Sequence, residues 1–216
     1  MESLFKYTKL DYIKSALYNG VYASVLTDVN DPYEWNGLEY AKDYRICCMT
    51  TSSRQMLMWS YYTHHSGCCI EYCFDESFLS NNIVRPVNYT DIYRNNRYLS
   101  LDEIYDHLYS KGKEWEHEKE VRAVWFRDDF DKKLWSVRDG LVFLKAKVRS
   151  ITFGILSDRS NEYFNVLKLL KEYNDNQPKD ETVKVKRFML SDTKYELVLD
   201  RQFDYLKELE KNLVYT

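Results

Sequence analysis

The sequence predicts an α+β fold, a single domain over residues 1–216 with a central mixed or mostly antiparallel sheet and flanking helices. Strand-like and helix-like stretches are mixed along the chain without the strict alternation of a parallel α/β fold. With only three Pro and six Gly, the chain contains no Pro/Gly/Ser-rich linker that would divide it. Hydrophobic residues make up 44%, which is enough for a buried core.

The periodicity of apolar residues assigns the individual elements. Alternating or continuous apolar runs predict strands at 4–7, 21–25, 45–50, 68–74, 83–89, 121–126, 141–146, 150–156, 183–190 and 195–200. Apolar residues at three- and four-residue spacing predict helices at 11–19, 55–65, 100–117, 161–173 and 203–213. Ser100 and Glu103 form a capping-box pattern, and the hydroxyl residues before residue 55 are expected to cap that helix. Pro86 marks an edge or bulged strand, and the last two strands are expected to form a hairpin around 191–192.

Composition narrows the classes of function. The net charge is −3 with acids and bases interleaved, which argues against a general binder of nucleic-acid backbones. No apolar stretch follows Met1, and the longest apolar runs are too short to span a bilayer, so we expect a cytoplasmic protein without a membrane partner. Four of the five Cys form the adjacent pairs Cys47–Cys48 and Cys68–Cys69, which favours reduced thiols.

An acidic stretch, KEWEHEKEVRAVW at 113–125, leads directly into a predicted central strand. If residues 118–126 are extended, Glu118, Glu120 and Arg122 share one face of that strand. The two carboxylates, roughly 6.5 Å apart at the backbone, could then divide the roles of ionised and protonated group. Glu118 and Glu120 are therefore candidate catalytic residues, and the alternative is a surface Glu–Arg ladder that stabilises the start of the strand.

A second group of candidates lies in MTTSSRQMLMWSYYTHHSGCCIEY, residues 49–72. The hydroxyls of Thr50, Thr51 and Ser52 follow a predicted strand and could hold the polar edge of a ligand. Trp59 and Tyr62 could supply a stacking wall. The alternative is that these residues cap a helix and pack in the core.

Two further patterns in the sequence bear on a site: the His and Cys residues at 64–73 and a turn at 30–34. Zinc would need Cys or His pairs at a regular spacing, and neither a CxxC pair nor a second spaced pair accompanies His64, His65, Cys68, Cys69 and Cys73. We therefore predict no metal site. The segment NDPYE, 30–34, is typical of a turn, and its acid and aromatic residue could also line a site.

Several of these motifs occur together in one bacterial family. They are FKYTKL at the start, NDPYE, Met58-Trp59-Ser60-x-Tyr62, Gly67-x-Cys69-Ile70-Glu71, Val87-x-Tyr89, and Lys111-x3-Trp115-x2-Glu118-x-Glu120-x-Arg122. The chain therefore resembles the domain-of-unknown-function family twenty-nine seventy-one over almost its whole length. It departs from the family at Thr8, where a basic residue is usual. This resemblance implies fold relatives and does not imply an activity.

The order of motifs also resembles that of ADP-ribosyltransferases. Lys6 or Tyr7 would occupy the first-strand position, Thr50 to Ser52 the hydroxyl position, and Glu118-x-Glu120 the acidic position. The likeness implies NAD as substrate and an ADP-ribosyltransferase or NAD glycohydrolase, as a toxin or phage-defence effector. Glu120 would then grip the ribose and stabilise its positive charge, and Glu118 would position the acceptor. The residues implied for nucleotide binding are Lys6, Tyr7, Thr50, Thr51, Ser52, Trp59, Tyr62 and Arg122.

Two other classes of function compete with this one. The first is a non-catalytic ligand- or partner-binding domain whose motifs are structural. The second is a nuclease, which would need spaced acids and a Lys around a metal, and Glu118-Lys119-Glu120 offers only their nearness. The sequence leaves open whether the chain is an enzyme, whether an acceptor would be nucleic acid or protein, and what the oligomeric state is.

Overall fold

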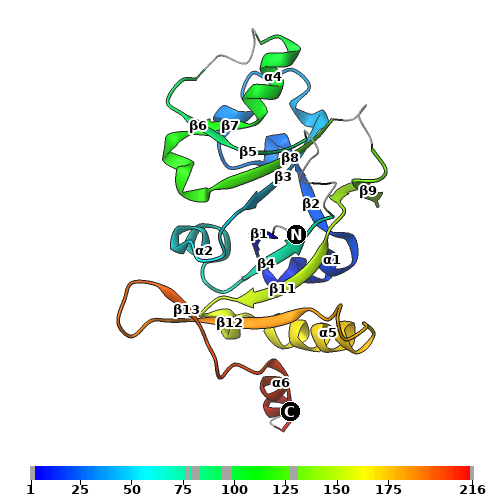
Figure 1. The fold of residues 1–216 in the computed structure, drawn as a ribbon, viewed down its shortest axis with the longest axis vertical. Coiled ribbons are helices and arrows are strands. Elements are labelled where there is room, and N and C mark those ends of the chain that lie inside the picture. The colour runs from blue at the N-terminus through cyan, green and yellow to red at the C-terminus, as the bar shows by residue number, and fades with distance from the viewer. Residues whose placement is uncertain (1–2, 76–77, 79–82, 94–98, 127–130, 215–216) are drawn as a thin grey trace. The chain divides into compact units, whose positions relative to one another are not determined.

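A computed structural model describes residues 3–75, 78, 83–93, 99–126 and 131–214 (Figure 1). The contact pattern divides the chain into two compact units, each assembled from distant segments. The first unit contains the described residues of 19–51 and 74–146, and the second those of 3–18, 52–73 and 147–214. The predicted α+β class, with mixed and mostly antiparallel pairing and flanking helices, is confirmed. The single domain over residues 1–216 stays a prediction.

The sheet of the first unit is antiparallel throughout. Its strands lie in the order β5-β8-β3-β2-β10-β9. Their bounds are β2 Val21–Val25, β3 Tyr44–Thr50, β5 Val84–Pro86, β8 Glu120–Phe126, β9 Trp135–Arg138 and β10 Leu141–Leu144. The Pro86 strand lies at an edge and pairs with β8, as predicted, because proline cannot donate a backbone hydrogen bond to a second neighbour.

Shorter elements complete the first unit. The strands β6 (Asn88–Thr90) and β7 (Ser110–Gly112) form a separate parallel pair, and α4 spans Leu101–Leu108. In the described part of this unit, 3-10 helices lie between the strands at Leu26–Asp28, Pro32–Glu34, Ala41–Asp43 and Lys113–Glu118. The buried apolar core lies between β3, β8, α4 and these connections, and includes Ile46, Leu108, Tyr109 and Val124. This core supports the segments that carry the acidic motif.

The sheet of the second unit is mixed. Its strands lie in the order β13-β12-β11-β4-β1, and only the β11–β12 pair is parallel. The bounds are β1 Ser3–Thr8, β4 Cys68–Cys73, β11 Lys147–Phe153, β12 Lys184–Leu190 and β13 Leu197–Leu199. The antiparallel pairing of β12 with β13 confirms the predicted hairpin.

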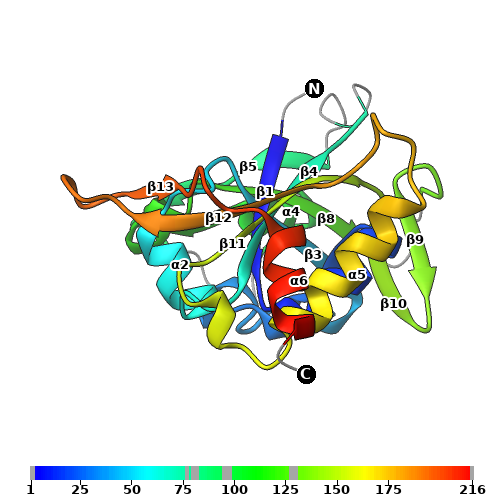
Figure 2. The same ribbon diagram turned by 90° about the horizontal axis from the view of Figure 1, so that it is seen from below.

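Helices flank the strands of the second unit. They are α1 Ile13–Asn19, α2 Met56–Thr63, α5 Tyr163–Asp175 and α6 Tyr205–Val214, with 3-10 helices at Leu10–Tyr12 and Ser157–Arg159. Figure 2 shows α5 and α6 side by side. None of the helices in the described part of the chain combines the length and the apolar character needed to cross a bilayer.

Two predictions about helices are wrong. The helix expected over 100–117 ends at Leu108, because its apolar stripe stops there and the Ser110 hydroxyl donates to the Asp106 carbonyl at 2.8 Å. Its capping box of Ser100 and Glu103 is confirmed. No hydroxyl caps α2, whose N-cap residue is Gln55, and Ser52 Oγ instead accepts from the Arg54 N–H at 3.3 Å.

Candidate functional site

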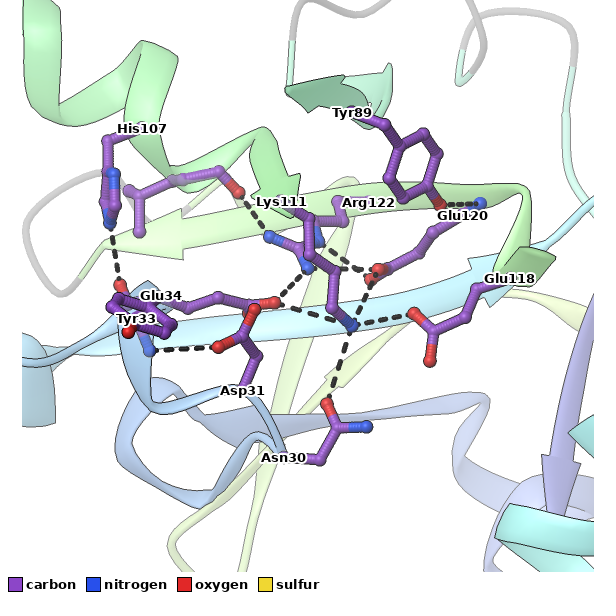
Figure 3. A network of polar contacts seen from close by, with 11 residues as sticks. Asn30, Asp31, Tyr33, Glu34, Tyr89, His107, Lys111, Glu118, Glu120 and Arg122 are labelled. Atoms are coloured by element: carbon purple, nitrogen blue, oxygen red, sulfur yellow. Dashed lines mark hydrogen bonds and ion pairs between the residues drawn. The ribbon is translucent and has the colours of Figure 1, made fainter. Parts of the chain in front are cut away.

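Five charged side chains meet inside the first unit, and we call them the charge cluster: Glu34, Lys111, Glu118, Glu120 and Arg122. Their residues are 0–6% exposed. They come from the turn after Asn30, from β7, from the 3-10 helix at 113–118 and from β8, and Figure 3 shows them converging. Ionised groups are rarely buried so completely unless they are paired, so the pairing within the cluster decides what it can do.

Backbone geometry explains how Glu118 and Glu120 reach the same cluster. The expectation that both lie on one strand is wrong, because Glu118 ends the 3-10 helix and β8 begins at Glu120. Lys119 between them has φ 47°, in the left-handed region, and this turn rather than strand alternation directs both carboxylates inward. The Thr50 hydroxyl donates to the Glu118 carbonyl at 2.6 Å, and the Glu120 N–H donates to the Tyr89 hydroxyl at 2.8 Å.

Arg122 holds two carboxylates at once. Its Nε donates to Glu120 Oε1 at 2.7 Å and its Nη2 to Glu120 Oε2 at 3.0 Å, a bidentate pair. The same Nη2 donates to Glu34 Oε1 at 2.7 Å, and Nη1 donates to the Leu108 carbonyl at 2.9 Å. The guanidinium is therefore the common donor of Glu34 and Glu120.

Lys111 is the second cation of the cluster. Its Nζ lies 2.7 Å from Glu118 Oε2 and 3.5 Å from the nearest oxygens of both Glu34 and Glu120. The ammonium also lies 4.5 Å from the centre of the Trp115 ring, an arrangement typical of a cation–π contact. Lys111 thus contacts all three acids of the cluster.

The turn at 30–34 delivers the third acid. Asp31 Oδ1 accepts from the Tyr33 N–H at 3.0 Å and starts the 3-10 helix, and the Glu34 carbonyl lies 3.0 Å from His107 Nε2. Among the described residues, Glu34 Oε2 is buried and has no hydrogen-bond partner. Such an oxygen strongly disfavours the charged carboxylate.

The pKa values of Glu34 and Glu120 are shifted in opposite directions. Burial is the largest influence on the pKa of Glu34 and raises it, although Arg122 and Lys111 act against burial. Burial acts in the same sense on Glu120, but Arg122 and then Lys111 outweigh it and hold the pKa of Glu120 at about 2. At Lys111 the three carboxylates outweigh burial and raise the pKa. At neutral pH, Glu120 is therefore firmly ionised, and Glu34 takes up a proton more readily than Glu120 does.

Part of the predicted nucleotide site lies beside the cluster. Thr50 is buried and stands opposite Glu120 in the β3–β8 register, and the Thr51 N–H donates to the Lys119 carbonyl at 3.3 Å. The first unit thus brings together the two threonines, the two predicted catalytic acids and Arg122, as the sequence suggested. Arg122 binds the acids rather than facing open space.

The other predicted residues gather in the second unit. The Tyr7 hydroxyl donates to the Ser52 carbonyl at 3.0 Å and accepts from the Gln55 N–H at 3.1 Å. Its ring meets Trp59 edge to face with the ring centres 5.2 Å apart, and burial raises the pKa of Tyr7. Trp59 is 0% exposed, so its faces are used by core packing.

Two further predicted residues complete that part. Tyr62, in α2, packs against the buried core that contains Tyr7 and Trp59. Lys6 lies on β1 opposite Ile70 of β4 and is half-buried. The aromatic wall expected from Trp59 and Tyr62 is therefore mainly a packing feature of the second unit.

No role was predicted for His107, and Lys111 was predicted only as part of the family motif. Glu34 was predicted as the acid of a turn that could also line a site. Distance in sequence conceals the contact of Glu34, because Glu34 and Arg122 are 88 positions apart. Within the described residues, no group of three or more His, Cys, Asp or Glu side chains is placed to hold a metal ion.

Comparisons with protein-family models, curated proteins and solved structures find no match to this chain. The resemblances noted from its motifs therefore stay predictions, and a functional proposal has to stand on the geometry of the site.

Proposed function

We propose that this chain is an NAD-consuming enzyme, an ADP-ribosyltransferase or NAD glycohydrolase, with the charge cluster as its reaction centre. The observation that carries the proposal is that one buried guanidinium holds two carboxylates, and that one of them, Glu34, has an oxygen without a hydrogen-bond partner among the described residues. Glu34 and Glu120 both accept from Arg122 Nη2, yet the pKa of Glu34 is raised and that of Glu120 lies at about 2. Neighbouring acids driven apart in this way are typical of sites that perform acid–base chemistry.

The chemistry divides between these two acids. When the bond between nicotinamide and ribose breaks, both bonding electrons leave with the nicotinamide nitrogen and the sugar becomes cationic. The ionised Glu120 supplies a fixed negative charge for that cation. An acceptor hydroxyl or water then adds to the sugar carbon, and its proton passes to Glu34, whose raised pKa suits a general base. Glu118, held by Lys111, would position the acceptor.

Burial sets a condition on this proposal. The five residues are at most 6% exposed, so a substrate reaches Glu120 only after covering residues have moved.

The test measures, by chromatography, how much nicotinamide the purified full-length chain releases from NAD. Glu34→Gln should lower the rate about 100-fold or more while keeping the fold, because an amide accepts from Arg122 but cannot take up the proton. Glu120→Gln should lower it by a comparable factor. Glu71→Gln, in the second unit, is the matched control and should leave the rate unchanged. Absence of nicotinamide from the wild-type reaction would overturn the proposal.

A second candidate function is favoured by the same burial. If the cluster only stabilises the first unit, the chain is a non-catalytic ligand- or partner-binding domain. The chain would then release no nicotinamide, and a ligand would raise the melting temperature while staying chemically intact. Glu120→Gln lowers the free energy of unfolding under either candidate. Measuring melting temperature and nicotinamide in the same samples separates the two candidates.

A further inference from the structure

The hairpin of β12 and β13 forms one edge of the sheet in the second unit. β13 is the last strand in the order of that sheet, and among the described strands it pairs with β12 alone. Figure 2 shows the tip of the hairpin extending away from α5 and α6. An edge strand presents backbone N–H and C=O groups to which a further strand can bind. β13 is therefore a candidate surface for strand addition.

The hydrogen bonds between β12 and β13 show which backbone groups face outward. The Asp200 N–H donates to the Arg187 carbonyl at 2.9 Å, so the backbone of Asp200 faces β12. Backbone direction alternates along an antiparallel pair. The N–H and C=O groups of Leu197 and Leu199 consequently point away from β12, toward the open edge.

Apolar side chains surround this edge on both faces of the hairpin. Leu190 and Leu199 are 57% and 39% exposed on one face, and Met189 is 41% exposed on the other. Tyr195, before the strand, is fully exposed. Native edge strands are usually protected by Pro or by charged side chains, as Pro86 protects β5, whereas the three residues of β13 are all apolar. An unprotected apolar edge of this kind favours pairing with another strand.

We propose that β13 pairs antiparallel with the β13 strand of a second copy of this chain, so that the protein forms a two-fold symmetric dimer. Lys194 precedes the strand and is exposed, and Asp200 follows it. Antiparallel pairing brings the start of one strand to the end of the other, so Lys194 of each copy approaches Asp200 of the other copy. Asp200 already accepts from Arg187 at 2.8 Å, so the second lysine extends an existing ion pair. Parallel pairing would bring the two copies of Lys194 together, which is unfavourable.

The same charges select a register for the pairing. Pairing centred on Leu197 sets its outward N–H and C=O against those of the other copy and places Lys194 across from Asp200. Pairing centred on Val198 would place Glu196 across from Asp200, and like charges in opposite positions destabilise a strand pair. The register centred on Leu197 is therefore the one that both the backbone direction and the charges favour.

The area of the contact requires more than the strand itself. A stable dimer usually buries about 800 Å² on each copy, which a strand of three residues does not supply alone. In the proposed register Tyr195 of one copy comes opposite Leu199 of the other, so the exposed apolar side chains beside the edge become covered as well. The inference does not rest on NAD cleavage, because the pairing uses no residue of the charge cluster.

Sedimentation velocity of the full-length chain, over a concentration series from micromolar to millimolar, tests the inference. We expect a reversible equilibrium between monomer and dimer. Leu199→Pro removes an outward N–H and keeps the hydrogen bonds to β12, so it should raise the dissociation constant of the dimer about tenfold or more. Lys194→Glu changes two symmetric contacts from attraction to repulsion and should raise it about tenfold at low salt. High salt should reduce the effect of Lys194→Glu.

Lys14→Glu is the matched control, because Lys14 is exposed on α1 of the same unit and the charge change is the same. It should leave the dissociation constant unchanged, and melting temperatures verify that each variant folds. A chain that stays monomeric up to millimolar concentration would overturn pairing with a second copy and leave the edge to a strand of another protein. A dimer that neither Leu199→Pro nor Lys194→Glu weakens would overturn the location at β13. Assemblies larger than a dimer would overturn the closed two-fold arrangement.

Discussion

The two units contain charged groups of the same kinds in opposite surroundings. In the second unit Glu71 lies beside Arg149 and Lys186, at 3.6 and 3.7 Å, and accepts from the hydroxyls of Ser3 and Ser150 at 2.8 and 2.5 Å. We call this group the Glu71 cluster. Its Arg and Lys side chains are 39% and 35% exposed, whereas those of the charge cluster are 1% and 3% exposed.

Burial decides how strongly each cluster depends on its cations. Around Glu71, hydroxyls supply the close hydrogen bonds, and these, with Lys186 and Arg149, lower the pKa despite partial burial. Water screens the two more distant cations, so losing one has little effect. In the charge cluster, two cations must serve three acids without solvent, and losing one leaves a buried charge uncompensated. Similar residues are thus dispensable in one unit and indispensable in the other.

The largest expected effect comes from removing the guanidinium of the charge cluster. Arg122→Met should lower the free energy of unfolding by about 3–5 kcal/mol, because Glu120 and Glu34 lose their common donor in a buried place. Arg149→Met, the matched change in the Glu71 cluster, should lower it by no more than about 1 kcal/mol. Urea unfolding followed by circular dichroism measures both. Equal losses in the two variants would show that burial does not distinguish the clusters.

The second-largest expected effect is a difference between the two clusters in how the free energy of unfolding depends on acid pH. The pKa of Glu120 is about 2 in the folded chain and 4.5 as its ordinary value. Because the folded pKa is depressed, Glu120 stabilises the fold fully above pH 4.5, and this contribution is lost as the pH falls toward 2. The shift corresponds to about 3 kcal/mol.

The measurement is the difference in unfolding free energy between wild type and Glu120→Gln, followed from pH 6 to pH 2. This difference should decrease by about 3 kcal/mol as the pH falls from 4.5 to 2. Glu71, whose pKa is lowered in a more exposed place, should show a smaller change in the Glu71→Gln comparison. A Glu120 difference that does not depend on pH would contradict the depressed pKa.

Glu34 should behave in the opposite sense. Its folded pKa is raised, so its contribution to stability is present below its ordinary pKa and is lost as the pH rises through the folded value. Glu34→Gln should therefore become more stable relative to wild type as the pH increases above 4.5, since the amide never becomes charged. The effect should be smaller than that of Arg122→Met, because Gln Oε1 can still accept from Arg122. A relative stability that falls with pH would show that Glu34 is normally ionised and well paired.

Local features of the fold could be read from the sequence. The apolar run after residue 120 predicted β8 to within one residue, and the Ser100–Glu103 pair predicted the start of α4. Both depend on neighbours within a few positions, where periodicity and capping are decisive. The short strands β7 and β9 were not predicted, because three or four residues are too few to show the alternation of apolar and polar residues typical of a strand.

The candidate site could be predicted only in part, for a physical reason. Glu118, Glu120 and Arg122 form a local motif, which the sequence left open as either a catalytic site or a surface Glu–Arg ladder. The left-handed turn at Lys119, which directs both carboxylates inward, has no clear sequence signal, because Lys rarely adopts a positive φ. Glu34 reaches the cluster through long-range packing, which one sequence without aligned relatives does not reveal. Lys111 lies seven positions before Glu118, but periodicity does not predict that a short strand and a 3-10 helix bring the two side chains together.

The smallest expected effect is also the one that salt should remove. Glu71→Gln should lower the free energy of unfolding by up to about 1 kcal/mol at low ionic strength, because Ser3 and Ser150 can still hydrogen-bond to an amide. Raising the salt concentration from 0.01 to 1 M shortens the screening length from about 30 to about 3 Å, so the attraction of Arg149 and Lys186 should largely disappear. The loss in Arg122→Met should change little over the same range, because solvent ions do not enter a cluster that is at most 6% exposed. Urea unfolding at both salt concentrations measures the contrast, and equal salt dependence in the two variants would mean that water reaches the charge cluster.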